Sequence, residues 1–200
     1  MGQKAIMAGR PRNFDENEII RKASEVFWKK GYESSSAEEL LEAMNMGKGS
    51  FYLHFKGGKQ ELYRRSLDLF SKESLERFQH GLEKADDKID FLKAFMMSIA
   101  DSPAERRRKG CYLGNCVVQM TNLEPKLKDQ AGVLLANLEQ VFFKIIQEAQ
   151  KLGRLKTKVQ PEILAKYLIN LRNGINVTAR TEKDIAQLKE MIRLSLDILK

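Results

Sequence analysis

The chain has 200 residues, of which 42% are hydrophobic and 31% are charged, proportions typical of a folded globular protein and not of a disordered one. No apolar run approaches the roughly 20 residues of a membrane span, and two cysteines and two histidines are too few for a disulfide framework or a zinc site. The 35 Lys and Arg against 27 Asp and Glu leave a net charge of +8, which favours an anionic partner, most often nucleic acid.

Apolar residues recur at spacings of three and four, and no long alternating run of β-branched and aromatic residues interrupts them. This pattern predicts an all-α protein. The first helix begins at a cap formed by Asp15 and ends at Gly31, and Ser35 or Ser36 caps a short second helix that ends near Met44. The remaining helices are predicted over about 48–54, 59–80, 87–101, 112–121, 125–152, 161–180 and 183–199.

The second and third helices are short and close together in the sequence. Asn45, between them, can adopt the left-handed conformation of a tight turn. Two short helices joined by such a turn form a helix-turn-helix, here over residues 36–55. Gly47 and Gly49 keep the beginning of the third helix slim, as entry into a DNA groove requires. The polar face of that helix offers Lys48, Ser50, Tyr52 and His54.

Three features between residues 15 and 65 carry a family resemblance: Gly31-Tyr32, the run Lys48-Gly49-Ser50-Phe51-Tyr52-Leu53-His54-Phe55, and Lys59. Through them the sequence resembles the TetR family of bacterial transcriptional repressors. The family often has a Ser cap where Gly47 stands, so the cap of the third helix is weaker here. The resemblance implies phosphate contacts from Ser35 or Ser36, Lys48, Tyr52, His54 and Lys59, and base-edge contacts from Gly49, Ser50 and Leu53.

A basic segment precedes the first helix. Arg10 and Arg12 flank a proline in Gly9-Arg10-Pro11-Arg12, which is too polar to pack against a core. Flexible arms of this kind insert Arg into the narrow minor groove of A·T-rich DNA. The arm over 1–13 is therefore a candidate DNA-binding element, and a solvated tail is the other interpretation.

The domain boundary is predicted at residue 58, with a DNA-binding domain over 1–58 and a second helical domain over 59–200. The resemblance implies that the second domain binds a small effector and forms a homodimer that matches a palindromic operator. Two apolar stripes at helical spacing favour a packed core. They are Leu134, Leu138, Val141, Phe142 and Ile145, and Leu164, Leu168, Leu171 and Ile175.

Asn170, Asn173, Asn176 and Arg180 recur at steps of three or four residues on one predicted helix. Buried amides need hydrogen-bond partners, so these side chains could line a polar pocket, face a second copy of the chain, or lie in water. The candidate residues for an effector pocket are Asn115, Gln119, Asn170 and Asn173.

Cys111 follows four cationic residues and Gly110, which indicates a loop before the next helix. A thiol at the positive end of a helix, close to cations, is favoured as the reactive thiolate. The Gly-Cys-x-x-Gly-Asn pattern resembles a TetR subgroup in which some members sense electrophiles or oxidants. Cys111 is therefore a candidate sensor, and a small buried thiol that tightens the start of the helix is the other interpretation. Cys116 points elsewhere, since it lies about 140° around the helix.

The leading hypothesis is a ligand-responsive repressor. A thiol enzyme using Cys111 lacks an obvious base, because His54 belongs to the DNA motif and His80 ends a helix. A DNA-binding architectural protein without a switch would not need the long second domain. We expect no catalytic residue, cofactor or metal. The start of the chain lacks the apolar segment of a signal peptide, so a cytoplasmic protein that does not enter membranes is expected.

Overall fold

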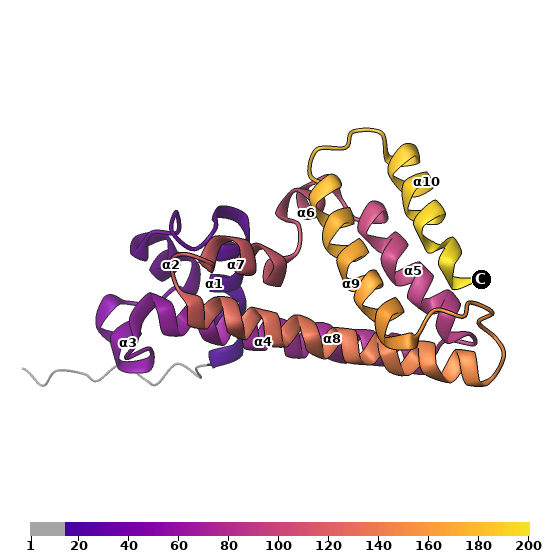
Figure 1. Ribbon diagram of the computed structural model, residues 1–200. Coiled ribbons are helices and arrows are strands. Elements are labelled where there is room, and N and C mark those ends of the chain that lie inside the picture. Colours follow the sequence, from indigo (N-terminus) through magenta and orange to yellow (C-terminus); the bar gives the residue numbers. More distant parts are fainter. Residues whose placement is uncertain (1–14) are drawn as a thin grey trace, which may run out of the picture.

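The computed structural model describes residues 15–200, and over this range the chain forms ten α-helices and a final 3-10 turn (Figure 1). Arg10 and Arg12 of the predicted arm lie outside the described residues. The elements are α1 (Glu16–Lys30), α2 (Ala37–Met44), α3 (Lys48–His54), α4 (Gly58–Glu83), α5 (Lys88–Asp101), α6 (Ala104–Lys109), α7 (Tyr112–Met120), α8 (Pro125–Lys151), α9 (Pro161–Thr178), α10 (Ile185–Leu196) and η1 (Asp197–Leu199).

Local signals set the beginnings of the first helices. The Asp15 carboxylate accepts hydrogen bonds from the backbone N–H groups of Asn17 and Glu18, and Ser36 forms a complete capping box with Glu39. Asn45 adopts the left-handed conformation, with φ 51° and ψ 47°, so α2 ends where the sequence predicts. The N-cap of α3, Gly47, makes no side-chain cap.

The short helix α6 is absent from the sequence-based prediction, which expected a loop near Gly110. Six residues are too few to display a helical period, so only Pro103 at the beginning and Gly110 at the end delimit this helix. Gly110 has φ 67° and ψ −151°, and a Cβ at this position would lie 2.5 Å from Nε of Arg180. Only glycine fits this backbone and this close approach. The chain can therefore turn sharply between α6 and α7.

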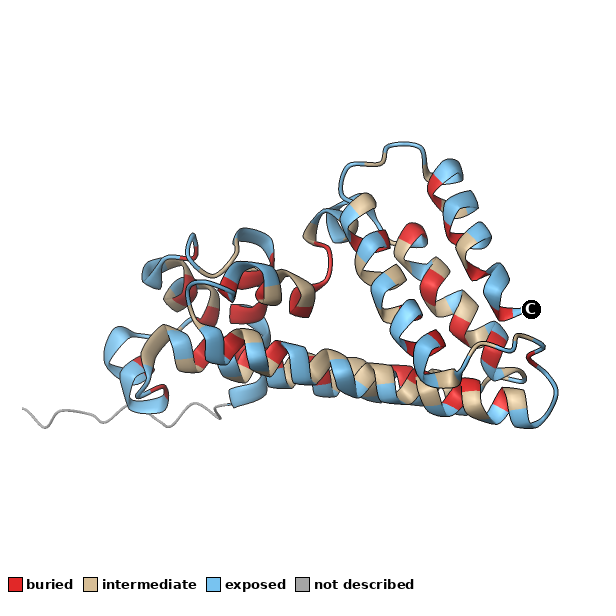
Figure 2. Cartoon of the chain, in the orientation of Figure 1, coloured by how far each residue is buried: buried red, intermediate tan, exposed pale blue. Residues whose placement is uncertain are grey.

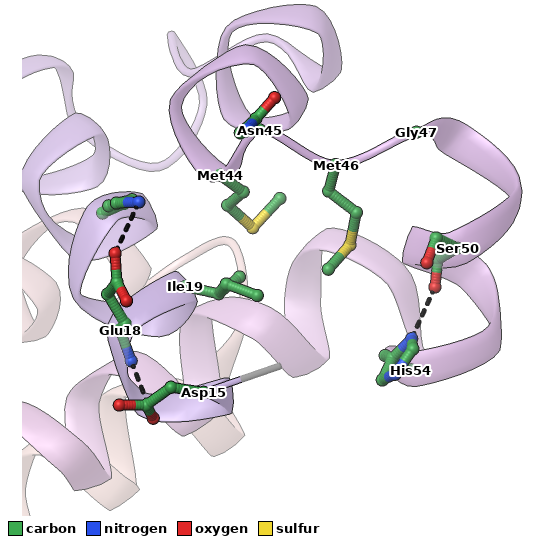
Figure 3. A pocket seen from close by; sticks show the side chains of 10 residues that line it. Asp15, Glu18, Ile19, Met44, Asn45, Met46, Gly47, Ser50 and His54 are labelled. Carbon is green, nitrogen blue, oxygen red and sulfur yellow. Dashed lines mark hydrogen bonds and ion pairs between the residues drawn. The ribbon is translucent and has the colours of Figure 1, made fainter. Parts of the chain in front are cut away.

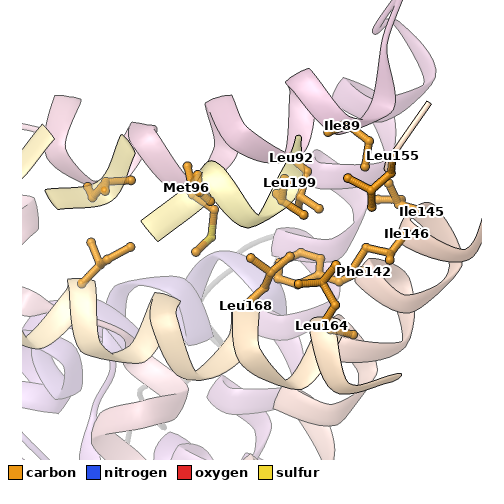
Figure 4. Close-up of a cluster of buried hydrophobic side chains, with 14 of the residues drawn as sticks. Ile89, Leu92, Met96, Phe142, Ile145, Ile146, Leu155, Leu164, Leu168 and Leu199 are labelled. Carbon is orange, nitrogen blue, oxygen red and sulfur yellow. The ribbon is translucent and has the colours of Figure 1, made fainter. Parts of the chain in front are cut away.

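Two clusters of buried side chains form the interior (Figure 2). The first cluster joins α1–α3 to the beginning of α4, to α7 and to the beginning of α8, with Phe27, Phe55, Leu62, Tyr63 and Tyr112 among its fully buried members. The second cluster joins α5, α9 and α10 to the far halves of α4 and α8 around Phe142 and Leu168 (Figure 4). Both clusters thus contain residues that follow the predicted boundary at residue 58.

The long helices α4 and α8 run beside each other along the molecule and contribute to both clusters (Figure 1). They contain 26 and 27 residues, which corresponds to about 40 Å each. None of the helices in residues 15–200 is long and apolar enough to cross a membrane.

Candidate DNA-binding surface and effector cavity

Six residues of α3 are exposed to solvent, and two buried phenylalanines, one in the helix and one directly after it, hold it on the domain. Phe51 and the following Phe55 are buried against α1 and α4, so the helix has one possible orientation on the domain. The exposed residues include all the predicted contacts on this helix. They are Lys48, Gly49, Ser50, Tyr52, Leu53 and His54. Leu53 is 77% exposed and Tyr52 is 52% exposed.

The beginning of α3 is open. A Cβ built on Gly47 or on Gly49 would meet no atom within 4 Å. Packing within the described residues therefore does not require glycine at position 49. Toward the other end of the helix, the His54 ring lies over its own helix, with Nδ1 2.8 Å from the carbonyl oxygen of Ser50.

A surface groove of about 610 Å³ separates α3 from the beginning of α1 (Figure 3). Met44 and Met46 form its apolar part, and Ser50 and His54 face it from α3. Its lining on α1 includes Asp15, Glu18, Ile19 and Lys22, and Glu18 forms an ion pair of 2.7 Å with Lys22.

The other predicted phosphate contacts differ in accessibility. Ser35 is completely buried, and its hydroxyl donates a hydrogen bond of 2.6 Å to the Gly31 carbonyl oxygen. Ser36 is exposed at the beginning of α2. Of the two serines that the sequence leaves open, only Ser36 can therefore reach a phosphate.

Lys59 is half-buried at the beginning of α4. Its ammonium lies 4.6 Å from the centre of the Tyr32 ring and donates to the Glu33 carbonyl oxygen, and partial burial lowers its pKa. The N–H of Gly57 at this helix end already donates to the Glu61 carboxylate at 2.7 Å, and this hydrogen bond lowers the pKa of Glu61. An incoming phosphate would compete with Glu61 for that N–H group.

A second cavity, of about 390 Å³, lies among the helices that connect the two buried clusters. Seven helices (α1 and α4 to α9) and the residue before α7 contribute to its walls. Apolar and aromatic side chains dominate its lining, and three arginines interrupt it. The lining residues are Trp28, Phe70, Ser71, Ser74, Leu75, Arg77, Phe78, Gly81, Phe91, Phe95, Arg106, Cys111, Leu113, Leu134, Leu135, Leu138 and Arg172. Apolar cavities of this size with a few polar groups are typical of small-molecule sites.

Cys111 lies in the wall of this cavity as the N-cap of α7, and only 8% of it is exposed. Its sulfur accepts a hydrogen bond from the Gly114 N–H at 3.4 Å and one from Nη1 of Arg172 at 3.3 Å. The sequence suggested the preceding cationic run as the source of charge at the thiol. The nearest contact comes from Arg172 on α9, and Arg106 of that run lies in the same cavity wall and also interacts electrostatically with Cys111.

Three members of this run have partners on α1 and at the C-cap of α5. The Arg106 guanidinium stacks 3.8 Å from the centre of the Trp28 ring, Arg107 donates to the Ser102 carbonyl oxygen, and Lys109 pairs with Glu25. Arg106 and Arg172 were missed as site residues. A cation at the centre of the mostly apolar α9 is the signal that could have identified Arg172.

The four predicted pocket residues do not line this cavity. Asn115 donates to the Lys109 carbonyl oxygen and accepts from Arg180, so it fixes the turn after α6. Gln119 is exposed and accepts from the Tyr32 N–H, and Asn170 is exposed. Asn173 keeps a buried amide oxygen that has no partner among the described residues. The structure does not bring these four side chains together.

Cys116 is completely buried away from the cavity lining, and its thiol donates to the Leu127 carbonyl oxygen at 3.6 Å. Burial raises the pKa of this thiol to about 11. A thiol with a raised pKa in an apolar environment is unreactive. Cys111 is thus the cysteine that a molecule in the cavity would meet.

Two family models match the chain. The model described as "Bacterial regulatory proteins, tetR family" matches residues 19–65, and "Tetracyclin repressor-like, C-terminal domain" matches residues 89–194. A curated relative, the HTH-type transcriptional repressor DhaR of Mycobacterium sp. (strain GP1), is 24% identical over 182 residues, which cover 90% of each chain.

Solved structures share the fold over nearly the whole chain. The TetR family transcriptional regulator CifR, a cysteine mutant complexed with 26-bp double-strand operator DNA, is 22% identical with a TM-score of 0.78, over 94% of this chain and 98% of that chain. The reduced form of Escherichia coli NemR is 16% identical with a TM-score of 0.81, over 92% and 96% of the two chains. With a helix-turn-helix and a C-terminal domain that both match, this chain belongs to the TetR family of DNA-binding transcriptional regulators.

Proposed function

We propose that the protein is a dimeric repressor that a small effector releases from a palindromic operator. The observation that carries this proposal is the cavity of about 390 Å³, since its wall includes Trp28 from α1 together with residues of α5, α8 and α9. A ligand there would contact the helix-turn-helix region and the C-terminal helices at once. Its effect on DNA binding can be no larger than its preference for one arrangement of these helices, commonly about 1–3 kcal/mol.

The DNA surface consists of α3 and the beginning of α2. Ser36, Lys48, Tyr52 and His54 contact phosphates, with Lys59 at the edge, while Gly49, Ser50 and Leu53 meet base edges. The exposure of these side chains on α3, and the slim helix beginning, support this assignment. The basic arm with Arg10 and Arg12 adds minor-groove contacts. Such a regulator acts on DNA in the bacterial cytoplasm.

The homodimer forms through α9 and α10. This single chain leaves large apolar side chains of this region in water: Ile163, Tyr167 and Val177 on α9, Met191 and Leu194 on α10, and Ile198 in η1. Burying them against a second copy removes this apolar surface from water. A two-fold axis there gives two α3 helices, which match two half-sites roughly 34–36 Å apart.

DNA binding at fixed salt tests this proposal. The purified protein is titrated against the intergenic DNA upstream of its own gene and against further promoter fragments, with a shuffled sequence of equal length as competitor. We expect saturable binding of one dimer per site that the shuffled DNA does not displace. Equal binding to all sequences would contradict the repressor proposal and support an architectural protein.

A covalent effector at Cys111 is a second candidate, favoured by the position of this thiol in the cavity wall and by the Arg172 donor at 3.3 Å. A donor of this kind stabilises the thiolate. N-ethylmaleimide is expected to release DNA from the parent protein and from the matched Cys116→Ser variant, but not from Cys111→Ser. Release from all three proteins, or from none, would leave Cys111 with a structural role only.

A further inference from the structure

We propose that the cavity beside Cys111 binds a small organic acid, whose carboxylate lies against Arg172 and Arg106 and whose aromatic or aliphatic body fills the apolar end. This inference rests on the effector role proposed above and specifies the chemical class of the effector. It is carried by the charges in the cavity, by the unsatisfied donor on Arg172 and by the shape of the lining.

The charged residues that line the cavity are all cations. Arg77, Arg106 and Arg172 line it, and no lining residue is Asp or Glu. Within residues 15–200, no carboxylate lies within ion-pair distance of Arg106 or Arg172, whereas Arg77 is 3.8 Å from Glu73. Burial, followed by the nearby charge of Arg172, lowers the pKa of Arg106. Glu25 acts on Arg106 only from beyond ion-pair distance, so the two neighbouring guanidinium groups repel each other, and a bound anion relieves this repulsion.

Arg172 also has an unsatisfied donor. Its Nη1 donates to the Cys111 sulfur, while its buried Nε has no hydrogen-bond partner in the described part of the chain. A buried N–H group without a partner is unusual in a folded protein and indicates a missing acceptor. A carboxylate offers two acceptor oxygens in the plane of a guanidinium group and is thus its matched partner.

The end of the cavity away from the arginines determines which kind of ligand body fits. Phe78, Phe91, Leu134, Leu135 and Leu138 make this end apolar. Such a surface excludes inorganic phosphate and favours an acid with a single charged end, because a second charge would lose its hydration without finding a partner. The volume of about 390 Å³ lies at the lower end of the usual range for ligand cavities, so the acid is small.

The same site connects the ligand to α1. The Arg106 guanidinium lies 3.8 Å from the centre of the Trp28 ring, and the indole Nε1 donates to the Gly110 carbonyl oxygen at 3.2 Å. A carboxylate that draws Arg106 toward Arg172 weakens this stack on the helix that supports the helix-turn-helix. Trp28 is the single tryptophan of the chain, so its fluorescence reports on the cavity directly.

The test is a fluorescence titration of the full-length protein with benzoate, cinnamate and octanoate, and with the primary amide of each acid. We expect at least one acid to change the Trp28 emission saturably and to bind on the order of 10-fold more tightly than its amide. If no acid binds, or if the amides bind as tightly as the acids, the inference is wrong.

Two variants distinguish the anion site from a structural arginine. In Arg172→Gln, the affinity for the acid is expected to fall by about 10-fold while that for the amide is unchanged. The matched control is Arg154→Gln, a surface arginine outside the cavity lining, which should bind the acid like the parent. Without ligand, Arg172→Gln should melt at the same or a higher temperature than the parent, since it removes an unpaired cation. A lower melting temperature with equal loss of acid and amide binding would overturn the assignment.

DNA binding is measured on the same preparations without ligand. Specific DNA binding by a protein that ignores all the acids would preserve the repressor and refute the anion site. Saturable acid binding by a protein without specific DNA binding would preserve the anion site and refute the repressor.

Discussion

Gly49→Ala is expected to stabilise the protein and to weaken DNA binding at the same time. Gly49 lies in α3, is exposed, and would place a Cβ in open space with no atom within 4 Å. Replacing a helical glycine by alanine without a clash raises the free energy of unfolding by roughly 0.5–1 kcal/mol. For a chain of this size that corresponds to an increase in Tm of about 1–4 °C.

The same methyl group occupies the space where α3 approaches the base edges. Losing one good base contact costs about 1–3 kcal/mol, which is a decrease in operator affinity of roughly 5- to 150-fold. Thermal unfolding followed by circular dichroism and DNA binding followed by fluorescence anisotropy give the two quantities. The matched control is Gly132→Ala, at an exposed glycine of another helix, α8, where a Cβ also meets nothing within 4 Å. A Gly49→Ala protein with a lower Tm, or with the DNA affinity of the Gly132→Ala protein, would refute this reasoning.

Three further outcomes are expected. Ser36→Ala removes the capping box of α2, so the free energy of unfolding should fall by about 1 kcal/mol in urea titrations, and an unchanged midpoint would contradict the cap. Asp87 caps α5, and hydrogen bonds from the N–H groups of Asp90 and Ile89 lower its pKa. Its contribution is therefore complete above the unfolded pKa of about 3.9 and is lost as the pH falls through the lowered folded pKa. Asp87→Ala should be less stable than the parent at pH 7 and equally stable well below pH 3. A difference in the free energy of unfolding that stays the same at all pH values would contradict a contribution from the ionised Asp87 carboxylate. Leu194→Glu on α10 should yield monomers by mass photometry, whereas the control Lys29→Glu, at an exposed residue of α1, should remain dimeric. A dimeric Leu194→Glu protein would exclude this interface.

Much of the helix-turn-helix could be predicted because its determinants are local. Asp15, Ser36 and Asn45 act within a few residues of their own position, and each does in the structure what its residue type predicts. The periodicity of the longer helices is equally local, and their ends agree within about three residues. The sequence could not show which of Ser35 and Ser36 is exposed, because the burial of the Ser35 hydroxyl depends on how α1 and α2 pack.

The cavity could not be predicted from the sequence. Trp28, Arg106 and Arg172 are far apart in the chain and meet only when α1, α6 and α9 are assembled. The regular spacing of the asparagines on α9 predicts a pocket at Asn170 and Asn173, whereas the residue that lines the cavity is Arg172 between them. A single arginine on a helix forms no periodic pattern, so sequence periodicity cannot identify it as a cavity residue.

The continuous helices α4 and α8 have a consequence for how the molecule loses its structure. Each of them belongs to both buried clusters without a break, so no hinge or linker insulates one half from the other. Melting either cluster frays a helix on which the other depends, and the two halves therefore unfold together in one cooperative transition. A substitution at the far end of the C-terminal bundle thus lowers the population of folded helix-turn-helix, although it touches neither DNA nor ligand.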